Sequence, residues 1–369
     1  MNRANLLLAL AGALGISLVL SLLLTALVMR ISRRIGFVDR PGGHKSHKEP
    51  VPYGGGVAIF LAAWVPATAA IILAVTVSQA WIAQTFGEEV RAYVGGLCDR
   101  ATQALVILAG GLVLHLLGLL DDRRPLGPIL KLFVIVGVSL FVILAGHVYL
   151  GSMLGRPLSI LLTLGWFVVI INAMNFLDNM DGLSAGVAWI CMAFLAVCGL
   201  LAEPMQVLVP ALACLFLGAI GGFWAFNFPP ARIFMGDAGS LLIGYMLAVV
   251  SVLTTYYQSG QPGAPYALAM PLVVLAVPLY DFTSVISIRI AEGRNPLRGD
   301  QRHFSHRLIE HGLDRRLAVL TIYLATATTG LAATLLPGAD LPRTITVAVI
   351  VLMILAVVAI LESPPRREP

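Results

Sequence analysis

The sequence predicts an all-α protein, a polytopic transmembrane helical bundle with about eleven spans. Composition is the first indication: of 369 residues, 59% are hydrophobic and only 12% are charged, and the mean hydropathy is +0.91. A soluble protein of this length carries roughly twice that share of charged residues. We therefore expect a single integral membrane domain, residues 1–369, with no separate soluble module and no nucleic-acid partner.

Recurring apolar runs are the second indication. Each run has about 20 residues, which is enough to cross a hydrocarbon core of about 30 Å as a helix. The predicted spans lie near residues 5–29, 55–77, 102–120, 128–146, 157–175, 184–202, 206–226, 239–258, 266–288, 318–336 and 343–361. The first run is longer than the roughly 7–15 residues of a signal-peptide core, which favours a retained span.

The distribution of basic residues is the third indication, and it predicts the orientation. With the N-terminus outside, the cytoplasmic loops and the C-terminal tail carry 19 of the 24 Lys and Arg residues. The positive-inside rule then places the N-terminus outside and the C-terminus inside. The four cysteines show no CxxC spacing, so we expect buried thiols and neither a disulfide nor a zinc site.

Five polar clusters fall on the predicted cytoplasmic side, next to apolar spans. They are residues 39–56, the pair Asp121–Asp122, residues 172–186 (NAMNFLDNMDGLSAG), residues 226–245 around Asp237, and residues 292–312. Charge bias alone does not require them, because carboxylates contribute little to topology. An acid pair such as Asp121–Asp122 at the end of a span is costly unless a cation shares it. Solvation, or pairing with Arg123 and Arg124, is the simpler alternative.

The second acidic cluster repeats amides and carboxylates every three residues, at Asn172, Asn175, Asp178 and Asp181. Neighbouring members lie close together on a helix. The direction drifts by about 60° per step, however, so all four cannot share one face of an ideal helix. Gly182 allows the backbone to deviate afterwards. A helix cap needs one such group, so four of them favour a ligand or metal site.

The last two clusters suit phosphate chemistry. Asp237 stands between two glycines that permit close backbone approach to a ligand, although an Asp at a helix start is also a common N-cap. The final loop combines histidines with arginines, which can bind diphosphate oxygens bidentately: Arg294, Arg298, Arg302, His303, His306 and Arg307. A solvated basic loop would explain the arginines well but the histidines poorly.

These residue types together indicate a reaction class. Carboxylates with a few other oxygens suit Mg²⁺, the usual partner of a diphosphate. Basic residues neutralise charge on a phosphoryl group during transfer. The residues therefore predict metal-dependent transfer of a phosphorylated group onto a membrane lipid. The alternatives are an inactive scaffold, which would not need the intact acid set, and a transporter of an anionic metabolite. Transporters place polar groups near the midplane and often contain inverted repeats.

The motifs also carry a resemblance. In order, they are Asp39-x-Pro41 with Lys45 and His47, the Asp121–Asp122 pair, Asn172 to Gly182, Asn227 ten residues before Asp237, and Asp300-x-x-His303-x-x-His306-Arg307. Over about residues 39–308 this arrangement resembles the polyprenyl-phosphate N-acetylhexosamine-1-phosphate transferases of glycosyltransferase family 4. That family consists of multi-span helical bundles in the cytoplasmic membrane, with the active site facing the cytoplasm.

The resemblance implies that a HexNAc-1-phosphate, here GlcNAc-1-phosphate, passes from a UDP-N-acetylhexosamine to polyprenyl (undecaprenyl) phosphate. UMP would be released, in the first membrane step of a cell-envelope glycan pathway. The implied cofactor is Mg²⁺, with Mn²⁺ as an alternative, held by Asn175 and Asp237. The implied catalytic residues are Asp121, Asp122, Asp178 and Asp181. The implied substrate-binding residues are Lys45, His47, Asn172, Asn227, Arg302, His303, His306 and Arg307. A homodimer is compatible with this assignment.

Two positions depart from the family pattern. Ser305 stands where many members have a histidine in His-x-His-His, and Asn179 stands where glycine is common after the first Asp. Ser305 can hydrogen-bond but cannot carry positive charge, so we expect it to affect sugar preference. The peptidoglycan branch usually has three consecutive histidines here. UDP-GlcNAc is therefore the predicted donor, and UDP-MurNAc-pentapeptide is the alternative.

Two titratable residues inside spans fall outside these motifs. An ionisable group in the membrane is expensive, so Asp281, with Arg289 eight residues further on, is predicted to pair structurally with a neighbouring helix. His115 is predicted to be packed and hydrogen-bonded.

Overall fold

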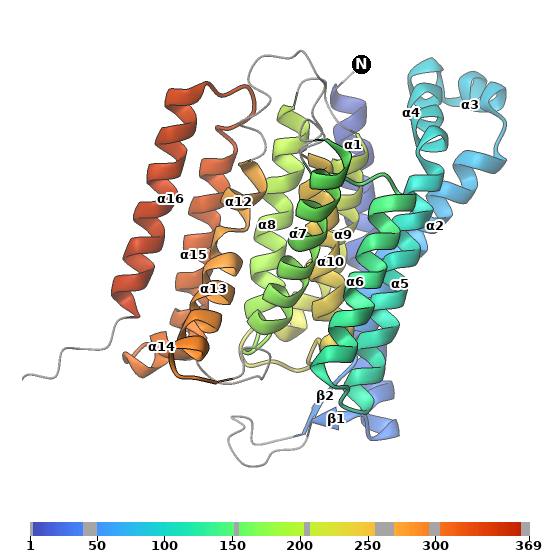
Figure 1. Ribbon diagram of the computed structural model, residues 1–369. Coiled ribbons are helices and arrows are strands. Elements are labelled where there is room, and N and C mark those ends of the chain that lie inside the picture. The colour runs from blue at the N-terminus through green and yellow to red at the C-terminus, as the bar shows by residue number, and fades with distance from the viewer. Residues whose placement is uncertain are drawn as a thin grey trace, which may run out of the picture.

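The computed structural model describes residues 3–39, 50–150, 155–202, 207–254, 269–294 and 303–362 as a bundle of helices (Figure 1). The longer helices are α1 (Arg3–Ile35), α2 (Gly55–Thr76), α5 (Ala101–Arg123), α6 (Pro128–Ala145), α7 (Arg156–Leu177), α8 (Leu183–Leu201), α9 (Leu208–Asn227), α10 (Asp237–Thr254), α13 (Ala276–Ala291), α15 (Arg315–Ala333) and α16 (Leu341–Leu361). The shorter helices are α3 (Gln79–Phe86), α4 (Glu88–Asp99), α12 (Met270–Val274) and α14 (Phe304–Glu310). The predicted all-α class is confirmed.

Ten helices in the described part of the chain are long and apolar enough to cross a membrane, and they match ten of the predicted spans. The span predicted near 266–288 is instead divided into α12 and α13 at Leu275. Pro278 has no N–H to donate to the Val274 carbonyl four residues earlier, and its ring crowds that carbonyl. The Cys191 thiol donates to the Val274 carbonyl instead, at 3.3 Å. The proline therefore explains why one apolar run forms two helices.

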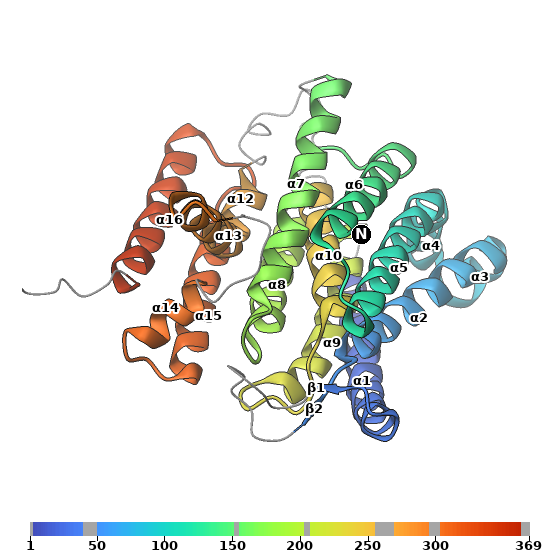
Figure 2. The same ribbon diagram turned by 60° about the horizontal axis from the view of Figure 1, so that its bottom comes forward.

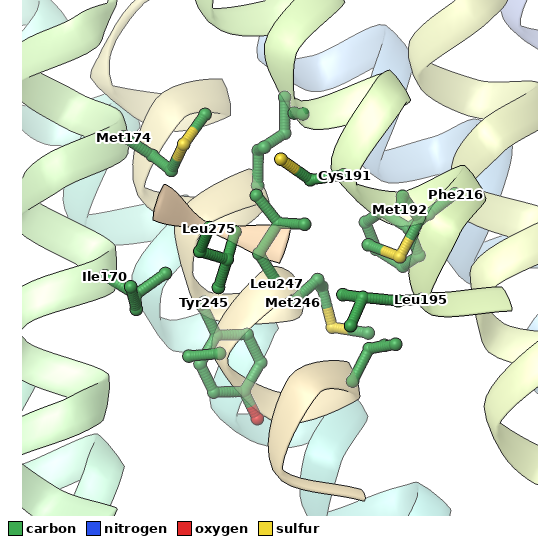
Figure 3. Close-up of a cluster of buried hydrophobic side chains, with 14 of the residues drawn as sticks. Ile170, Met174, Cys191, Met192, Leu195, Phe216, Tyr245, Met246, Leu247 and Leu275 are labelled. Atoms are coloured by element: carbon green, nitrogen blue, oxygen red, sulfur yellow. The ribbon is translucent and has the colours of Figure 1, made fainter. Parts of the chain in front are cut away.

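Helix α10 lies at the centre of the bundle. It packs against α2, α5, α7 and α8, and 16 of its 18 residues are buried. Figure 3 shows Tyr245, Met246 and Leu247 of α10 among side chains of α7, α8 and α9, with Leu275 beside them. Such a buried helix has few ways to shift, because protein interiors are close-packed. The first residue of α10, Asp237, therefore has a fixed place relative to the neighbouring helices.

The strands β1 (Val38–Asp39) and β2 (Val51–Pro52) pair antiparallel beside the start of α10. The Phe234 N–H donates to the Pro52 carbonyl at 2.9 Å, and the Gly55 N–H donates to the Phe234 carbonyl at 3.0 Å. These bonds attach the first polar cluster of the sequence to the segment that precedes Asp237.

The described parts of the polar clusters gather at one end of the bundle. Helices α5, α7, α9 and α13 end there, α10 and α14 begin there, and the β1–β2 pair lies there too (Figures 1 and 2). Helix α1 begins at the opposite end, and α16 ends at the cluster end (Figure 1). Helices α3 and α4, which no apolar run predicts, lie at the end where α1 begins.

The prediction for His115 is confirmed, whereas the predicted burial of the cysteines holds for Cys191 and Cys198 and not for Cys98 and Cys214. His115 is buried, its Nδ1 lies 3.0 Å from the Ala238 carbonyl oxygen, and its ring stacks on Phe60 at 4.4 Å. All four cysteines are free thiols; Cys191 and Cys198 are fully buried, and the other two are half-buried.

Candidate active site

Asp122 holds the start of α10. Its Oδ1 accepts a hydrogen bond from the backbone N–H of Asp237 at 2.7 Å, and its Oδ2 accepts one from Ala238 at 3.1 Å. A helix leaves such first-turn N–H groups without an internal partner. Gly236, at φ 73°, has no room for a side chain, because a Cβ atom would collide with the Asp122 carboxylate. Asp122 thus caps α10, and the Asp237 carboxylate remains available for other contacts.

The Asp237 carboxylate is bound on both sides. Asn175 Nδ2 donates to its Oδ1 at 3.0 Å, and Lys131 Nζ donates to its Oδ2 at 2.9 Å. The same amide lies 2.9 Å from Ser240 Oγ, and the same ammonium lies 3.1 Å from Asp121 Oδ2. Four helices, α5, α6, α7 and α10, therefore contribute to one polar site. We call Asp121, Asp122, Lys131, Asn175 and Asp237 the carboxylate cluster.

Lys131 is the member of this cluster that the motifs do not predict. It lies in the first turn of α6, inside an apolar run, and from the sequence it counts only toward the basic residues of the cytoplasmic side. A charged residue within a span is expensive and usually has a partner. The position of Lys131 inside an apolar run is therefore the sequence feature that could indicate a functional or paired lysine. The partners, Asp121 and Asp237, come from helices distant in the sequence.

Asp178 adds a further carboxyl group beside the cluster. It directly follows α7 and is half-buried. Burial raises the pKa of Asp178 well above its usual range, and the charges of Asp237, Asp122 and Asp181 raise it further. Among these carboxylates the Lys131 ammonium contacts only that of Asp237. A further cation at this place would offset the burial and the repulsion between neighbouring carboxylates, and would favour their ionised forms.

Asp181 and Asn227 fasten the α7–α8 turn to the segment before α10. Asp181 Oδ2 accepts a hydrogen bond from the Ala231 N–H at 3.0 Å. Asn227 Oδ1 accepts one from the Gly182 N–H at 3.0 Å, and its Nδ2 donates to the Ile233 carbonyl at 2.9 Å. Asn227 is buried, and both groups of its amide are used within the protein. This geometry favours a positioning role for Asn227, and its contact with substrate stays a prediction.

The four polar residues at three-residue spacing, from Asn172 to Asp181, do not share one face, as the angular drift along a helix predicts. Asn172 Nδ2 donates to the Val168 carbonyl of its own helix at 2.7 Å, whereas Asn175 faces α10. Asp178 and Asp181 lie beyond the end of α7.

The first motif is described only in part. Lys45 and His47 lie outside the described residues, as does Arg302 of the last loop. Tyr53, which follows β2, stands close to the carboxylates of the site. Burial raises the pKa of its phenol, and the negative charges around it, that of Asp39 first, raise it further.

A buried carboxylate holds His303, the residue that precedes α14. His303 Nδ1 lies 2.9 Å from Asp281 Oδ2, and Asp281 Oδ1 accepts a hydrogen bond from the Phe304 N–H at 2.8 Å. The two side chains are 5% and 1% exposed. Asp281 therefore pairs with a neighbouring helix, as we expected, and that helix is α14. A neutral His303 that donates through Nδ1 keeps Nε2 as an acceptor.

Arg307 ties α14 to two other helices. Its Nε and Nη2 donate to Glu362 Oε2 at 3.1 and 2.9 Å, and Nη2 also donates to Ser284 Oγ at 2.8 Å. Glu362, at the end of α16, accepts a further bond from the Tyr280 hydroxyl at 2.5 Å. Arg307 is thus engaged within the protein, and its contact with a donor phosphate stays a prediction.

His306 is half-buried on α14. Burial lowers its pKa, and the positive charge of Arg315 lowers it further, against opposing effects of Glu310 and Asp281. A neutral imidazole at neutral pH can accept a hydrogen bond from a ligand as well as donate one.

In the described residues, no group of three or more His, Cys, Asp or Glu side chains forms a preformed metal site. Mg²⁺ commonly binds proteins through one or two carboxylates and completes its shell with waters and substrate phosphates. Asp237 supplies carboxylate oxygens for such a site. The Asn175 amide contacts it, and the Asp178 carboxyl group lies nearby.

The fold and the site define an integral membrane protein with a carboxylate-rich polar site at one end of its helical bundle. Residues 104–255, which include the whole carboxylate cluster, match the family model of glycosyl transferase family 4. The chain is 30% identical over 357 residues to the probable undecaprenyl-phosphate N-acetylglucosaminyl 1-phosphate transferase of Bacillus subtilis, covering 93% of this chain and 89% of that protein.

Two further relatives extend this similarity. The decaprenyl-phosphate N-acetylglucosaminephosphotransferase of Mycolicibacterium smegmatis is 34% identical over 94% of this chain and 87% of its own length. The undecaprenyl-phosphate alpha-N-acetylglucosaminyl 1-phosphate transferase of Escherichia coli K12 is 27% identical over 81% of this chain and 76% of its own length. The chain belongs to glycosyl transferase family 4.

Proposed function

We propose that the protein transfers GlcNAc-1-phosphate from UDP-GlcNAc to a polyprenyl phosphate and releases UMP. A phosphate oxygen of the lipid attacks the phosphorus that carries the sugar. The bond from that phosphorus to the UMP oxygen breaks, and a polyprenyl-diphosphate-linked sugar forms. The observation that carries the proposal is the carboxylate cluster at one end of a membrane bundle, in a chain whose relatives bear the names of such transferases.

We further propose that Mg²⁺ binds at Asp237, with Asn175 as a second contributor and Mn²⁺ as an alternative ion. When bound, the ion would neutralise charge on the diphosphate of the donor. Support comes from the carboxyl groups gathered around Asp178 and Asp237: their mutual repulsion and burial raise the pKa of Asp178, and Lys131 contacts Asp237 but not Asp178.

The protein's own groups have separate tasks in this proposal. Lys131 places a positive charge beside Asp121 and Asp237, where phosphate oxygens of the lipid and the donor would meet. Asp121 orients that ammonium, and Asp122 fixes the start of α10 so that Asp237 keeps its position. His303 and His306 would bind donor phosphates or the sugar from α14. Such preorganised charges act where charge develops and need no rearrangement during the reaction.

The site is proposed to face the cytoplasm, with the protein in the cytoplasmic membrane. The described polar clusters share one end of the bundle, and most of the basic residues fall on the same predicted side. Nucleotide sugars are cytoplasmic metabolites, so a cytoplasmic site gives the donor direct access.

One assay tests the reaction. Purified protein receives polyprenyl phosphate, Mg²⁺ and either UDP-GlcNAc, another UDP-HexNAc or UDP-MurNAc-pentapeptide, and UMP release is measured. We expect the fastest turnover with UDP-GlcNAc and none without the lipid phosphate. Preferred use of the pentapeptide donor would leave the reaction class standing and overturn the sugar assignment. Failure with every donor, by a protein that is folded, would overturn the proposal.

A further inference from the structure

Ser305 and Asn179 are in direct contact, although 126 positions separate them in the sequence. Ser305 Oγ donates a hydrogen bond to Asn179 Oδ1 at 2.6 Å, and Ser305 is 1% exposed. These are the two positions at which the chain departs from the pattern of the family that it resembles. One contact thus joins both departures.

The contact has a defined polarity. Asn179 Nδ2 donates to the Phe176 carbonyl at the end of α7, at 2.9 Å. A carbonyl can only accept, so the amide must turn its nitrogen toward Phe176 and its oxygen toward Ser305. The Ser305 hydroxyl must then act as the donor. The Asn179 side chain therefore connects the last turn of α7 to the second residue of α14.

The contact connects two parts of the candidate site. Asn179 directly follows Asp178, and Ser305 lies between His303 and His306. The Phe176 ring, on the same turn as Asn179, stands edge-on to the His303 ring at 6.0 Å. A displacement of α14 relative to the α7–α8 turn would break both contacts.

From this geometry we propose that Asn179 and Ser305 form one positioning unit that holds the histidine segment of α14 against the Asp178 turn, and that each residue compensates for the other. The inference rests on the proposed transfer reaction. An imidazole at 305 would have to occupy space that the Asn179 side chain fills, because Ser305 is buried. A glycine at 179 would free that space. The serine therefore requires the asparagine, and a histidine at 305 requires a small residue at 179.

A reciprocal exchange tests the proposal with Ser305→His, Asn179→Gly and the double variant. Ser305→His alone should lower kcat/KM for UDP-GlcNAc by about tenfold or more, because overpacking a buried site displaces its neighbours. Asn179→Gly alone should lower it between about two- and tenfold, as expected for one lost hydrogen bond. The double variant should be more active than Ser305→His alone. A double variant whose loss is the product of the two single losses would overturn the proposal, as would a fully active Ser305→His protein.

A second cycle uses small replacements that do not overpack the site: Ser305→Ala, Asn179→Ala and their combination. Removing either partner breaks the same bond. The double variant should therefore have a kcat/KM for the donor no lower than that of the less active single variant. The kinetic constants should change for the donor, while KM for the polyprenyl phosphate stays within about twofold. Additive losses, or equal effects on donor and lipid, would contradict a unit that positions the donor-binding segment.

Melting temperatures of all variants separate this inference from the proposed function. If wild-type protein releases no UMP from any UDP-sugar, the reaction assignment fails. The exchange still has an outcome in that case, because the double variant should melt above Ser305→His. A double variant that melts above Ser305→His, even without turnover, would support the compensating pair. A double variant that melts below Ser305→His would contradict it.

Discussion

The Lys131 ammonium lies 2.9 Å from Asp237 Oδ2 and 3.1 Å from Asp121 Oδ2, between carboxylates from α10 and α5. Lys131 is itself on α6, so three helices meet at one cation. The three side chains are between 14% and 26% exposed. Because these side chains are partly buried, solvent and salt screen their charges less than they would in bulk water. The group carries one positive and two negative charges, so a bound cation would help a phosphate-bearing ligand to approach the Lys131 ammonium.

Removing the Lys131 charge should slow the reaction. We expect Lys131→Gln to lower kcat by roughly 10²-fold, comparable to the loss of one preorganised electrostatic contact. Lys131→Arg retains the charge with a different shape and should lose less. UMP release at saturating donor and lipid measures both. Equal rates for the Gln and Arg variants would contradict a charge-based role for Lys131.

Asp237 should be required for the metal-dependent rate. Asp237→Asn keeps the size of the side chain and the backbone N–H that bonds to Asp122. We expect it to lose roughly 10²–10³-fold in kcat at saturating Mg²⁺ while the protein still folds. A chelator should abolish wild-type turnover, and added Mg²⁺ should restore it. A variant that keeps more than about a tenth of the wild-type rate would exclude Asp237 as the metal contact.

The chain's sequence predicts the helices better than it predicts the partners of the polar residues. Apolar runs of about 20 residues determine spans without reference to the rest of the molecule. Residues such as Lys131 and Asp281 differ, because their roles depend on which helices become neighbours. Nothing near Lys131 in the sequence indicates that Asp237, 106 positions away, lies beside it. Likewise, the resemblance implies a catalytic role for Asp122 and gives no sign that its carboxylate caps α10, as it does in the structure.

The two acids of the adjacent pair should therefore behave differently. Asp122 accepts from two N–H groups of α10, and an asparagine there can accept only through one oxygen. Loss of a helix cap costs about 0.5–2 kcal/mol, so Asp122→Asn should lower both the melting temperature and the rate. Asp121→Asn retains an oxygen for the Leu126 N–H and should mainly lower the rate. Thermal unfolding in detergent, measured beside UMP release, tests the difference. Similar melting temperatures for the two variants would argue against the capping role.

The orientation predicts which exposed positions an impermeant thiol reagent can reach in intact cells. Glu88 and Arg124 are both exposed. Glu88 begins α4 and Arg124 directly follows α5, so they belong to opposite ends of the bundle. In a background without the four native cysteines, Glu88→Cys should be labelled from outside. Arg124→Cys should react only after the membrane is opened. The reverse pattern would place the carboxylate cluster on the outer side and overturn the proposed topology.

Asp281 should act through His303. Asp281→Asn keeps an oxygen for the Phe304 N–H but turns its NH₂ toward His303 Nδ1. That nitrogen must then accept, so the neutral imidazole carries its proton on Nε2 and can no longer accept there. We expect about tenfold lower kcat/KM for the donor with little change in KM for the lipid.

Two variants decide whether this effect passes through the histidine. His303→Gln alone should lose at least as much activity as Asp281→Asn. The double variant should be no worse than His303→Gln, because residues that act as one unit are not additive. Independent, multiplying losses would show that Asp281 serves only the packing of α13 and α14. A fully active Asp281→Asn protein beside an inactive His303→Gln protein would show that the histidine works without its buried carboxylate.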